Sequence, residues 1–350
     1  MRPATRGMFM RTASASCSLA AKAFALAVLA GFTFSATTAD AKPRKRQHVE
    51  RQKPRKAVDN TSDSNDDGVR WRYGSAAIMV DANTGKVLYA QNPDALRHPA
   101  SVTKVMTLYL LFEQLEAGKL KLTSDLEVSS KAASQSPSKL GLKPGSTIEV
   151  EDAIKAIVTR SANDVAVVIA ENIGGSEANF GRMMTAKARA LGMSRTTFVN
   201  ASGLPNQRQV TTARDLSILG RAIQERFPKK YKYFATRSFY YRGERIGNHN
   251  RLLGRVEGVD GIKTGYTRAS GFNLLTNVER DGRHLVGVVL GGSSGRSRDN
   301  RMAELISDYL PKAYAGGQMV AKITENTSLA AILPEARPKE LTEGAPLPLR

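Results

Sequence analysis

Short runs of hydrophobic residues alternate with turn residues at the start of the folded part of the chain. The runs SAAIMVD, from Ser75, and KVLYA, from Lys86, are rich in residues that favour β-strands. Asn83 and Gly85 lie between them and suit a tight turn. This pattern predicts two short strands, in a folded domain that begins near Trp71.

The middle of the chain has the longer spacing of hydrophobic residues that is typical of helices. The run that begins at Ser101 is apolar on nearly all sides, which predicts a buried central helix. Residues 211–227 form an amphipathic stretch in which Thr212 and Asp215 have the spacing of a capping box. We expect further helices over residues 151–160, 164–175 and 176–193.

Strand-like runs return near the end of the domain, and a helix over residues 300–310 closes it. Asp281-Gly282 suits a tight turn between the last two strands. This order of elements predicts an α/β fold of the α+β kind, with a mainly antiparallel five-stranded sheet and helices on both of its faces. The late strands are predicted over residues 259–267, 271–279 and 284–292.

Residues 1–41 have the pattern of a secretion signal. Three arginines precede a short apolar run, Ala23–Phe34, and Ala39-Asp40-Ala41 matches a cleavage site. Cleavage there makes Lys42 the first mature residue, whereas the alternative is an uncleaved signal anchor. We therefore expect export across the inner membrane, into the periplasm or the cell-wall space.

Residues 42–69 contain too few apolar residues to form a core, which predicts a disordered linker. The basic part, Lys42–Lys56, either contacts an anionic surface or is a solvated tether, and Asp59–Asp67 is acidic. We expect no nucleic-acid partner, because no recognition fold accompanies the basic run. The folded domain is then predicted over residues 70–315, and the Gly- and Pro-rich residues 316–350 are a predicted weakly structured tail.

Composition limits the chemistry open to the chain. It has 350 residues, of which 41% are hydrophobic, and a formal net charge of +20. The one cysteine, Cys17, precedes the apolar run of the signal, so the predicted mature chain has no thiol and no disulfide. Four histidines without ligand spacing make a zinc hydrolase a poor fit. We expect neither a metal nor another cofactor.

Ser101 and Lys104 are three residues apart at the start of the predicted central helix, so their side chains share one face. A serine hydroxyl becomes a nucleophile when a base takes its proton. A lysine whose pKa is lowered by burial beside another cation can be that base. Backbone N–H groups at a helix start also favour a developing oxyanion. The alternative is a capping serine beside a lysine that extends to solvent.

Two further motifs contain polar residues that have either a chemical role or an ordinary structural role. Ser161 and Asn163 lie between two predicted helices, where they either relay protons and hold the lysine or cap the next helix. Lys263, Thr264 and Gly265 lie on a predicted strand. There the lysine and threonine can hold a carboxylate and the glycine permits close approach, or the segment is an ordinary edge strand.

Together these motifs resemble a known signature. Ser-x-x-Lys, Ser-x-Asn and Lys-Thr-Gly occur in this order, at a helix start, in an interhelical loop and on a late strand, as in penicillin-binding proteins and class A β-lactamases. The stretches PASVTKVMT, SANDVAVVIAE and VDGIKTGYT resemble those of the low-molecular-mass D-alanyl-D-alanine carboxypeptidases, serine peptidases of family S11. The resemblance covers about residues 72–310 and implies a β-lactamase-like fold.

The resemblance implies roles for the residues of the first two motifs. Ser101 is the implied acylated nucleophile and Lys104 is its base. Ser161 and Asn163 form the implied second active-site strip, which relays protons and fixes the lysine and the substrate.

The third motif is implied to bind the end of the substrate. By resemblance, Lys263, Thr264 and Gly265 hold its terminal carboxylate. Backbone N–H groups of Ser101 and Tyr266 are the implied oxyanion hole.

Three features leave the resemblance incomplete. Arg298 lies where the family has an arginine that assists carboxylate recognition, but Arg296 is close enough to be the alternative. Some relatives have histidine where this chain has Tyr266, so a side-chain role at that position is in doubt. Many relatives also end in a membrane-binding amphipathic helix, whereas prolines interrupt the tail of this chain.

The implied activity is removal of the terminal D-alanine from peptidoglycan stem peptides that end in D-Ala-D-Ala, with β-lactams as covalent inhibitors. One alternative is a D,D-endopeptidase that cuts cross-links. A second is a class A-like β-lactamase, but no Glu-x-x-x-Asn element follows Asn163, and Glu171 is interpreted as a helix residue. A third is a wall-binding protein with a dead site, which three intact motifs disfavour.

Overall fold

The computed structural model describes residues 74–316 and 322–326. All of the described residues belong to one compact unit, which lies within residues 59–350. The predicted signal peptide and linker, and most of the predicted tail, lie outside the described residues.

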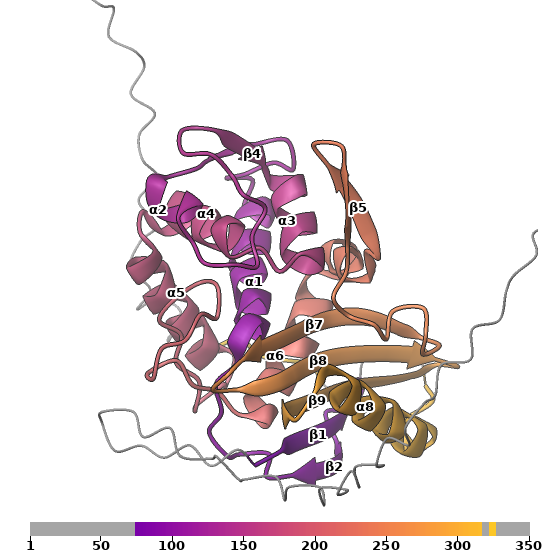
Figure 1. Ribbon diagram of the computed structural model, residues 1–350. Helices are drawn as coiled ribbons and strands as arrows, with labels where there is room; N and C mark the ends of the chain where they lie inside the picture. Colours follow the sequence, from indigo (N-terminus) through magenta and orange to yellow (C-terminus); the bar gives the residue numbers. More distant parts are fainter. Residues whose placement is uncertain (1–73, 317–321, 327–350) are drawn as a thin grey trace, which may run out of the picture. The chain divides into compact units, whose positions relative to one another are not determined.

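A five-stranded antiparallel sheet, in the order β2-β1-β9-β8-β7, is the frame of the domain (Figure 1). The first two strands pair with each other, and β1 also pairs with β9, so the late strands join the early ones as the sequence predicts. The predicted strand over residues 259–267 is confirmed as β7, which forms one edge of the sheet. The strands are β1 (Ala76–Asp81), β2 (Val87–Gln91), β7 (Val259–Thr267), β8 (Gly271–Arg280) and β9 (Arg283–Gly292).

Helices cover both faces of this sheet, which confirms the predicted arrangement. Alternate residues of a strand point to opposite faces, and β9 divides accordingly: Val286 and Val288 join the main core, whereas Leu285 and Val289 join a second cluster. Helix α6 (Ala213–Arg226) supplies Leu216, Leu219 and Ile223 to the main core. Helix α8 (Gly295–Tyr309) supplies Met302, Leu305 and Ile306 to the second cluster on the other face (Figure 1).

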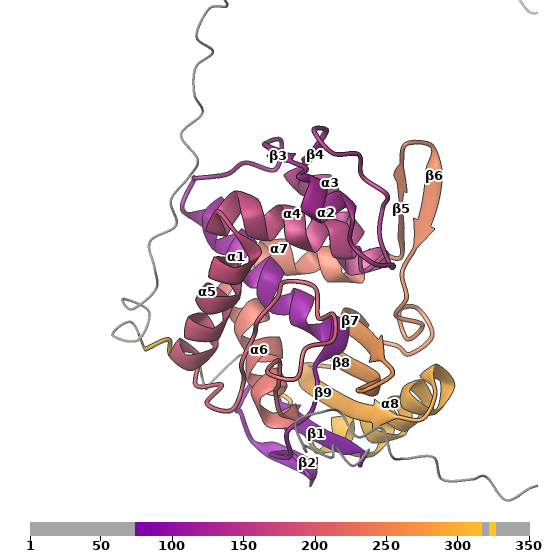
Figure 2. The ribbon, with the colours of Figure 1, turned by 60° about the vertical axis from the view of Figure 1, so that its left-hand side comes forward.

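The remaining helices pack around a buried central helix. A 3-10 turn, η1 (Ala100–Thr103), leads directly into α1 (Lys104–Glu116), so Ser101 lies in the turn and Lys104 begins the helix. Helix α1 packs against α4, α5 and α6, and Figure 2 shows it between them. The helices of this layer are α3 (Val150–Thr159), α4 (Asn163–Gly174) and α5 (Glu177–Ala190).

The predicted capping box at the start of α6 is present only in part. The Thr212 hydroxyl accepts a hydrogen bond from the Asp215 backbone N–H at 3.0 Å. The Asp215 carboxylate accepts instead from the Arg195 backbone N–H and from the Thr196 hydroxyl. It therefore ties the preceding loop to the helix rather than capping Thr212 in return.

Several short elements have no counterpart in the sequence prediction. The hairpin of β5 (Ser238–Tyr241) and β6 (Glu244–Gly247) turns at Arg242 and Gly243, both at positive φ, as a tight hairpin turn requires. The others are β3 (Asp125–Glu127), β4 (Thr147–Glu149), α2 (Ser130–Ala133), α7 (Pro228–Tyr231), η2 (Lys232–Ala235) and η3 (Leu310–Lys312).

Residues 322–326, within the predicted tail, lie against the helical layer. The Ile323 backbone N–H donates to Glu225 at 2.8 Å, and the Asn326 backbone N–H donates to the Ala190 carbonyl at 2.9 Å. Glu325 pairs with the buried Lys187. These contacts were not expected from the sequence of the tail, because they depend on helix residues 98 to 138 positions earlier in the chain. Over the described part of the chain, no helix is long and apolar enough to cross a membrane.

Candidate active site

A cleft of about 710 Å³ brings the three sequence motifs together. Its walls come from η1, from the loop between α3 and α4, from β7, from the loop 248–251 and from the start of α8. Of the residues singled out from the sequence, Ser101, Ser161, Asn163, Thr264, Gly265, Tyr266, Arg296 and Arg298 line this cleft. Lys104 and Lys263 are buried directly behind them.

The side chains of Ser101 and Lys104 meet as their spacing predicts. Lys104 Nζ lies 3.2 Å from Ser101 Oγ and 2.7 Å from Asn163 Oδ1. Its third contact is the backbone carbonyl of Ser202. Two of these three partners are carbonyl oxygens, which only accept hydrogen bonds. A neutral lysine amine donates its two N–H groups to them and directs its lone pair at the Ser101 hydroxyl.

The surroundings of Lys104 favour this neutral form. Its side chain is fully buried, and burial is the largest cause that lowers the pKa of Lys104 well below its usual value. The charge of Lys263 lowers the pKa further, and Asp164 opposes this in part. Lys104 therefore has the position and the charge state of a general base for Ser101.

The Ser161-Ala162-Asn163 segment connects α3 to α4 at the edge of the cleft. Ser161 adopts a positive φ of 60°, which turns the chain between the two helices. Its hydroxyl is buried, and within the described residues it has no hydrogen-bond partner. Asn163 begins α4 and connects Lys104 to the loop above, because its amide nitrogen donates to the Ser136 carbonyl at 2.9 Å. The segment therefore does more than cap a helix.

Strand β7 brings the Lys-Thr-Gly motif against Ser101. A side chain at Gly265 would place its Cβ 3.0 Å from the Ser101 backbone nitrogen, so any larger residue would push β7 and η1 apart. Lys263 is buried and donates to the Thr264 carbonyl at 2.9 Å. Burial and then the charge of Arg298 lower the pKa of Lys263 to about 7. Tyr266 is exposed at the mouth and stacks on Phe272 at 4.2 Å between ring centroids.

The structure distinguishes the two candidate arginines. Arg298 is buried, and its guanidinium donates to Asp299 at 2.7 Å and to the Asn273 carbonyl at 3.2 Å. These bonds fix it beside Lys263. Arg296 is exposed at the rim of the cleft. The fixed guanidinium of Arg298 is therefore the better placed to meet a carboxylate.

Two residues of the site were missed by the sequence analysis. Gly203, at φ +85°, packs so closely that a Cβ would lie 1.9 Å from the Ala100 carbonyl oxygen. The NASGL stretch contains this glycine and the Ser202 carbonyl that Lys104 contacts. No motif of the sequence predicted that the Ser202 carbonyl contacts Lys104 or that Gly203 packs against Ala100.

The second is His249, which lines the mouth of the cleft. Its loop is fixed on both sides, because Asn248 donates to the Thr236 carbonyl and Asn250 donates to the Gly261 carbonyl. The ring remains open to solvent on one side. Desolvation by the cleft walls, followed by the charges of Lys263, Arg160 and Lys104, lowers the pKa of His249 to about 4. It is therefore a neutral polar group at neutral pH.

This arrangement agrees with comparisons to known proteins. A sequence profile of the D-alanyl-D-alanine carboxypeptidase family, peptidase S11, matches residues 70–294. The chain belongs to this family. The matched residues include all three of the motifs singled out from the sequence.

Curated relatives of this S11 chain have the same family name. D-alanyl-D-alanine carboxypeptidase DacF of Bacillus subtilis is 33% identical over 258 residues, which cover 71% of this chain and 66% of the relative. DacC of Escherichia coli is 36% identical over 239 residues, which cover 66% of this chain and 60% of the relative. The chain therefore spans less than two thirds of the length of these relatives.

Solved structures of similar proteins have the same fold. Penicillin-binding protein 5 of Haemophilus influenzae matches with a TM-score of 0.65 and 30% identity, over 67% of this chain and 70% of that one. Penicillin-binding protein D2 of Listeria monocytogenes, in its ampicillin-bound form, matches with a TM-score of 0.58 and 30% identity, over 66% of this chain and 95% of that one.

The carboxylates of Glu171 and Asp299 in this S11 chain are already engaged in hydrogen bonds. Glu171 lies on α4, as its interpretation as a helix residue requires, and accepts from the Ser129 hydroxyl. Among the described residues that line the cleft, Asp299 is the sole carboxylate, and it holds Arg298. No described carboxylate in the cleft is thus available to activate water as in a class A β-lactamase.

Proposed function

We propose that this protein is a serine D-alanyl-D-alanine carboxypeptidase that removes the terminal D-alanine from peptidoglycan stem peptides. The observation that carries the proposal is the contact between Ser101 Oγ and the buried Lys104 Nζ, at the bottom of a cleft that contains a carboxylate-binding set of cations. Its membership of the S11 family and the names of its relatives support the substrate.

In the proposed acylation step, Lys104 takes the proton of Ser101, and Oγ attacks the carbonyl carbon between the two D-alanines. Backbone N–H groups of Ser101 and Tyr266 stabilise the negative oxygen. The C–N bond then breaks, and the leaving D-alanine takes the proton through Lys104 and Ser161. The buried hydroxyl of Ser161, which has no hydrogen-bond partner among residues 74–316 and 322–326, supports this relay.

The leaving D-alanine carries the terminal carboxylate. We assign its recognition to Lys263, Thr264 and Arg298, the groups that β7 and α8 place on one side of Ser101. Gly265 lets the substrate backbone lie against β7. Water then hydrolyses the ester, which releases the shortened peptide and restores the Ser101 hydroxyl.

The same chemistry makes β-lactams covalent inhibitors in this proposal. A penicillin acylates Ser101, but after ring opening its amine stays attached to the acyl group and does not leave. In addition, the cleft has no free described carboxylate to activate water. We therefore expect slow release of the penicilloyl group, unlike a β-lactamase. Stoichiometric rather than continuous turnover of nitrocefin checks this distinction.

Release of D-alanine from a synthetic peptide that ends in D-Ala-D-Ala tests the proposed function. We expect release by the wild type and none by Ser101→Ala. Incubation with cross-linked muropeptides in parallel addresses a D,D-endopeptidase, the activity named for a Pseudomonas aeruginosa relative that is 32% identical over 221 residues. Cleavage of cross-links without release of D-alanine would replace the proposed activity with that one.

The charge of Lys263 gives the proposed reaction a dependence on pH. A cationic Lys263 attracts the substrate carboxylate, and its pKa of about 7 means that the charge is lost as the pH rises through neutrality. We expect kcat/KM to fall on the alkaline side, mainly through a rise in KM. Lys263→Arg retains its charge at these pH values, so this variant should lose that alkaline limb.

We also propose export of the chain, with residues 1–41 as its signal and the periplasm or the cell-wall space as its location. The substrate class supports this, because peptidoglycan lies outside the inner membrane. We further propose that the basic run Lys42–Lys56 contacts an anionic surface. Fractionation of cells that express the full chain, and the N-terminal sequence of the mature protein, test both the location and the cleavage site.

A further inference from the structure

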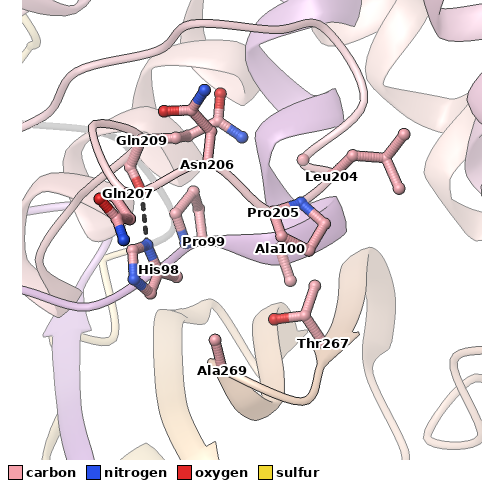
Figure 3. A pocket seen from close by; sticks show the side chains of 11 residues that line it. His98, Pro99, Ala100, Leu204, Pro205, Asn206, Gln207, Gln209, Thr267 and Ala269 are labelled. Carbon is pink, nitrogen blue, oxygen red and sulfur yellow. Dashed lines mark hydrogen bonds between the residues drawn. The ribbon is translucent and has the colours of Figure 1, made fainter. Parts of the chain in front are cut away.

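A second hollow, of about 190 Å³, adjoins the catalytic cleft. It shares Gly203, Leu204 and Thr267 with the cleft. Figure 3 shows its walls: residues 203–209 lie on one side, and the turn after β7, with Ala269, lies on the other. Pro99 and Ala100, directly before Ser101, lie between them. We call this second hollow the acyl-side pocket.

The position of the pocket along β7 gives it a place on the substrate. β7 is an edge strand, and an extended peptide can lie along such an edge. If the carboxylate lies at Thr264 and the scissile carbonyl at Ser101, the rest of the peptide continues toward Thr267. Thr264 and Thr267 are three strand residues apart, which is roughly 10 Å. This is about the distance from the terminal carboxylate, past the acylated D-alanine, to the residue before it. The pocket thus meets the residue that precedes the D-alanyl-D-alanine unit.

The lining of the pocket is neutral. Of the described residues that form it, none is an aspartate, glutamate, lysine or arginine. Its apolar part comes from prolines, alanines and Leu204, and its polar part from amide and hydroxyl groups. His98 Nδ1 donates to the Gln209 carbonyl at 2.8 Å, because a carbonyl oxygen only accepts. Exposed Arg208 and Arg268 flank the two walls in sequence.

Both walls are held in place by side-chain hydrogen bonds. In the turn, the Thr267 and Ser270 hydroxyls are 2.9 Å apart, and each also bonds to backbone of the turn. In the opposite wall, Asn200 accepts from the Gly203 backbone N–H and donates to the Leu204 carbonyl. Gln209 accepts from backbone N–H groups at the base of this wall. The pocket is therefore built before a ligand arrives.

We propose that the acyl-side pocket binds the side chain of the residue that precedes the D-alanyl-D-alanine unit, and selects an uncharged side chain over one that ends in an ammonium group. An ammonium group placed there loses water and meets no carboxylate in exchange. Amide groups of the walls can instead pair with a neutral polar group, while the apolar part contacts its methylenes. This inference rests on the proposed carboxypeptidase function.

Two peptides that differ in a single charge test the selection. We compare Nα-acetyl-L-lysyl-D-alanyl-D-alanine with its Nε-acetylated form, on the wild type and on two variants. We expect the wild type to have a kcat/KM about tenfold or more higher for the acetylated peptide, within the range that one side-chain pocket provides. Ala269→Glu adds a carboxylate to the pocket, and it should lower this ratio at least fivefold.

Ala178→Glu, on the exposed face of α5, adds the same charge away from the pocket and should keep the wild-type ratio. Thermal melting shows whether each variant is folded. As a second readout, each peptide competes with a penicillin for Ser101, which gives a binding ratio even if no peptide is hydrolysed. A wild-type ratio within twofold in both readouts, or an unchanged ratio in Ala269→Glu, overturns the inference. Absence of hydrolysis with the binding ratio intact counts against the proposed function alone.

Discussion

Replacement of Lys104 by methionine should slow acylation of Ser101 about a thousandfold, whereas the domain stays folded. Methionine fills the buried space but cannot take the proton of Ser101, and general-base catalysis contributes typically about 10²–10⁴-fold. The Asn163 and Ser202 oxygens lose their donor, but a desolvated amine is removed at the same time. The measurement is the rate of penicillin acylation by stopped-flow or quenched mass spectrometry.

Lys187→Met is the matched control for this variant. Lys187 is also buried, but it pairs with Glu113 and Glu325 outside the cleft. Its replacement leaves these two carboxylates with only the longer contacts to Arg226, at 3.7 and 3.5 Å, among their described ion pairs. We therefore expect a lower melting temperature and a nearly unchanged acylation rate. An acylation rate for Lys104→Met within tenfold of the wild type would mean that another group is the base.

Gly203→Ala is expected to have the second large effect, on both the stability and the reaction. Its Cβ would overlap the Ala100 carbonyl oxygen and lie 2.9 Å from the Ser101 backbone nitrogen, so the turn that holds the nucleophile must move. The positive φ adds strain of about 1–2 kcal/mol. We expect the free energy of unfolding to fall by about 1–3 kcal/mol, and acylation of Ser101 to slow more than a hundredfold.

Gly192→Ala separates these two causes. Gly192 has a similar positive φ of 87°, but a Cβ there meets nothing within 4 Å. The control should therefore lose a similar amount of stability from strain and keep the acylation rate. Denaturant titrations and acylation rates of the two variants provide the comparison. If they acylate equally fast, Gly203 does not position Ser101.

Much of the frame of this domain could be predicted from the sequence, because hydrophobic spacing records burial. The central helix and β7 have long buried runs, and each was found at nearly its observed bounds. The turn at Asp281-Gly282 was equally clear, since both residues adopt the positive φ that such turns need. The short strands β3 and β4, of three residues each, are too brief to give a period.

The parts of the candidate site that consist of side chains in a motif could be predicted from the sequence. The parts that depend on backbone contacts could not. Ser101, Lys104 and Lys263 stand in short signatures that read in order along the chain. The Ser202 carbonyl contacts Lys104, and Gly203 packs against Ala100, in both cases through backbone atoms that every residue has. These contacts join residues about a hundred positions apart, so no local pattern predicts them. His249 is a single histidine in a loop, and only the folded chain places it beside two lysines.

The choice between Arg296 and Arg298 shows the same limit. One residue separates them on one helix, and their spacing does not indicate which of them faces the cleft interior. Packing does, because Asp299 and the Asn273 carbonyl hold Arg298 inside while Arg296 stays at the rim.

The central claim is that Ser101 is the nucleophile and that its acyl group is released slowly when the acyl donor is a penicillin. Intact-protein mass spectrometry after incubation with benzylpenicillin tests it most directly. The account predicts one penicilloyl adduct per wild-type molecule, located on Ser101 by peptide mapping, and no adduct on Ser101→Ala. An adduct that persists on Ser101→Ala, or that maps to another residue of the wild type, would contradict it.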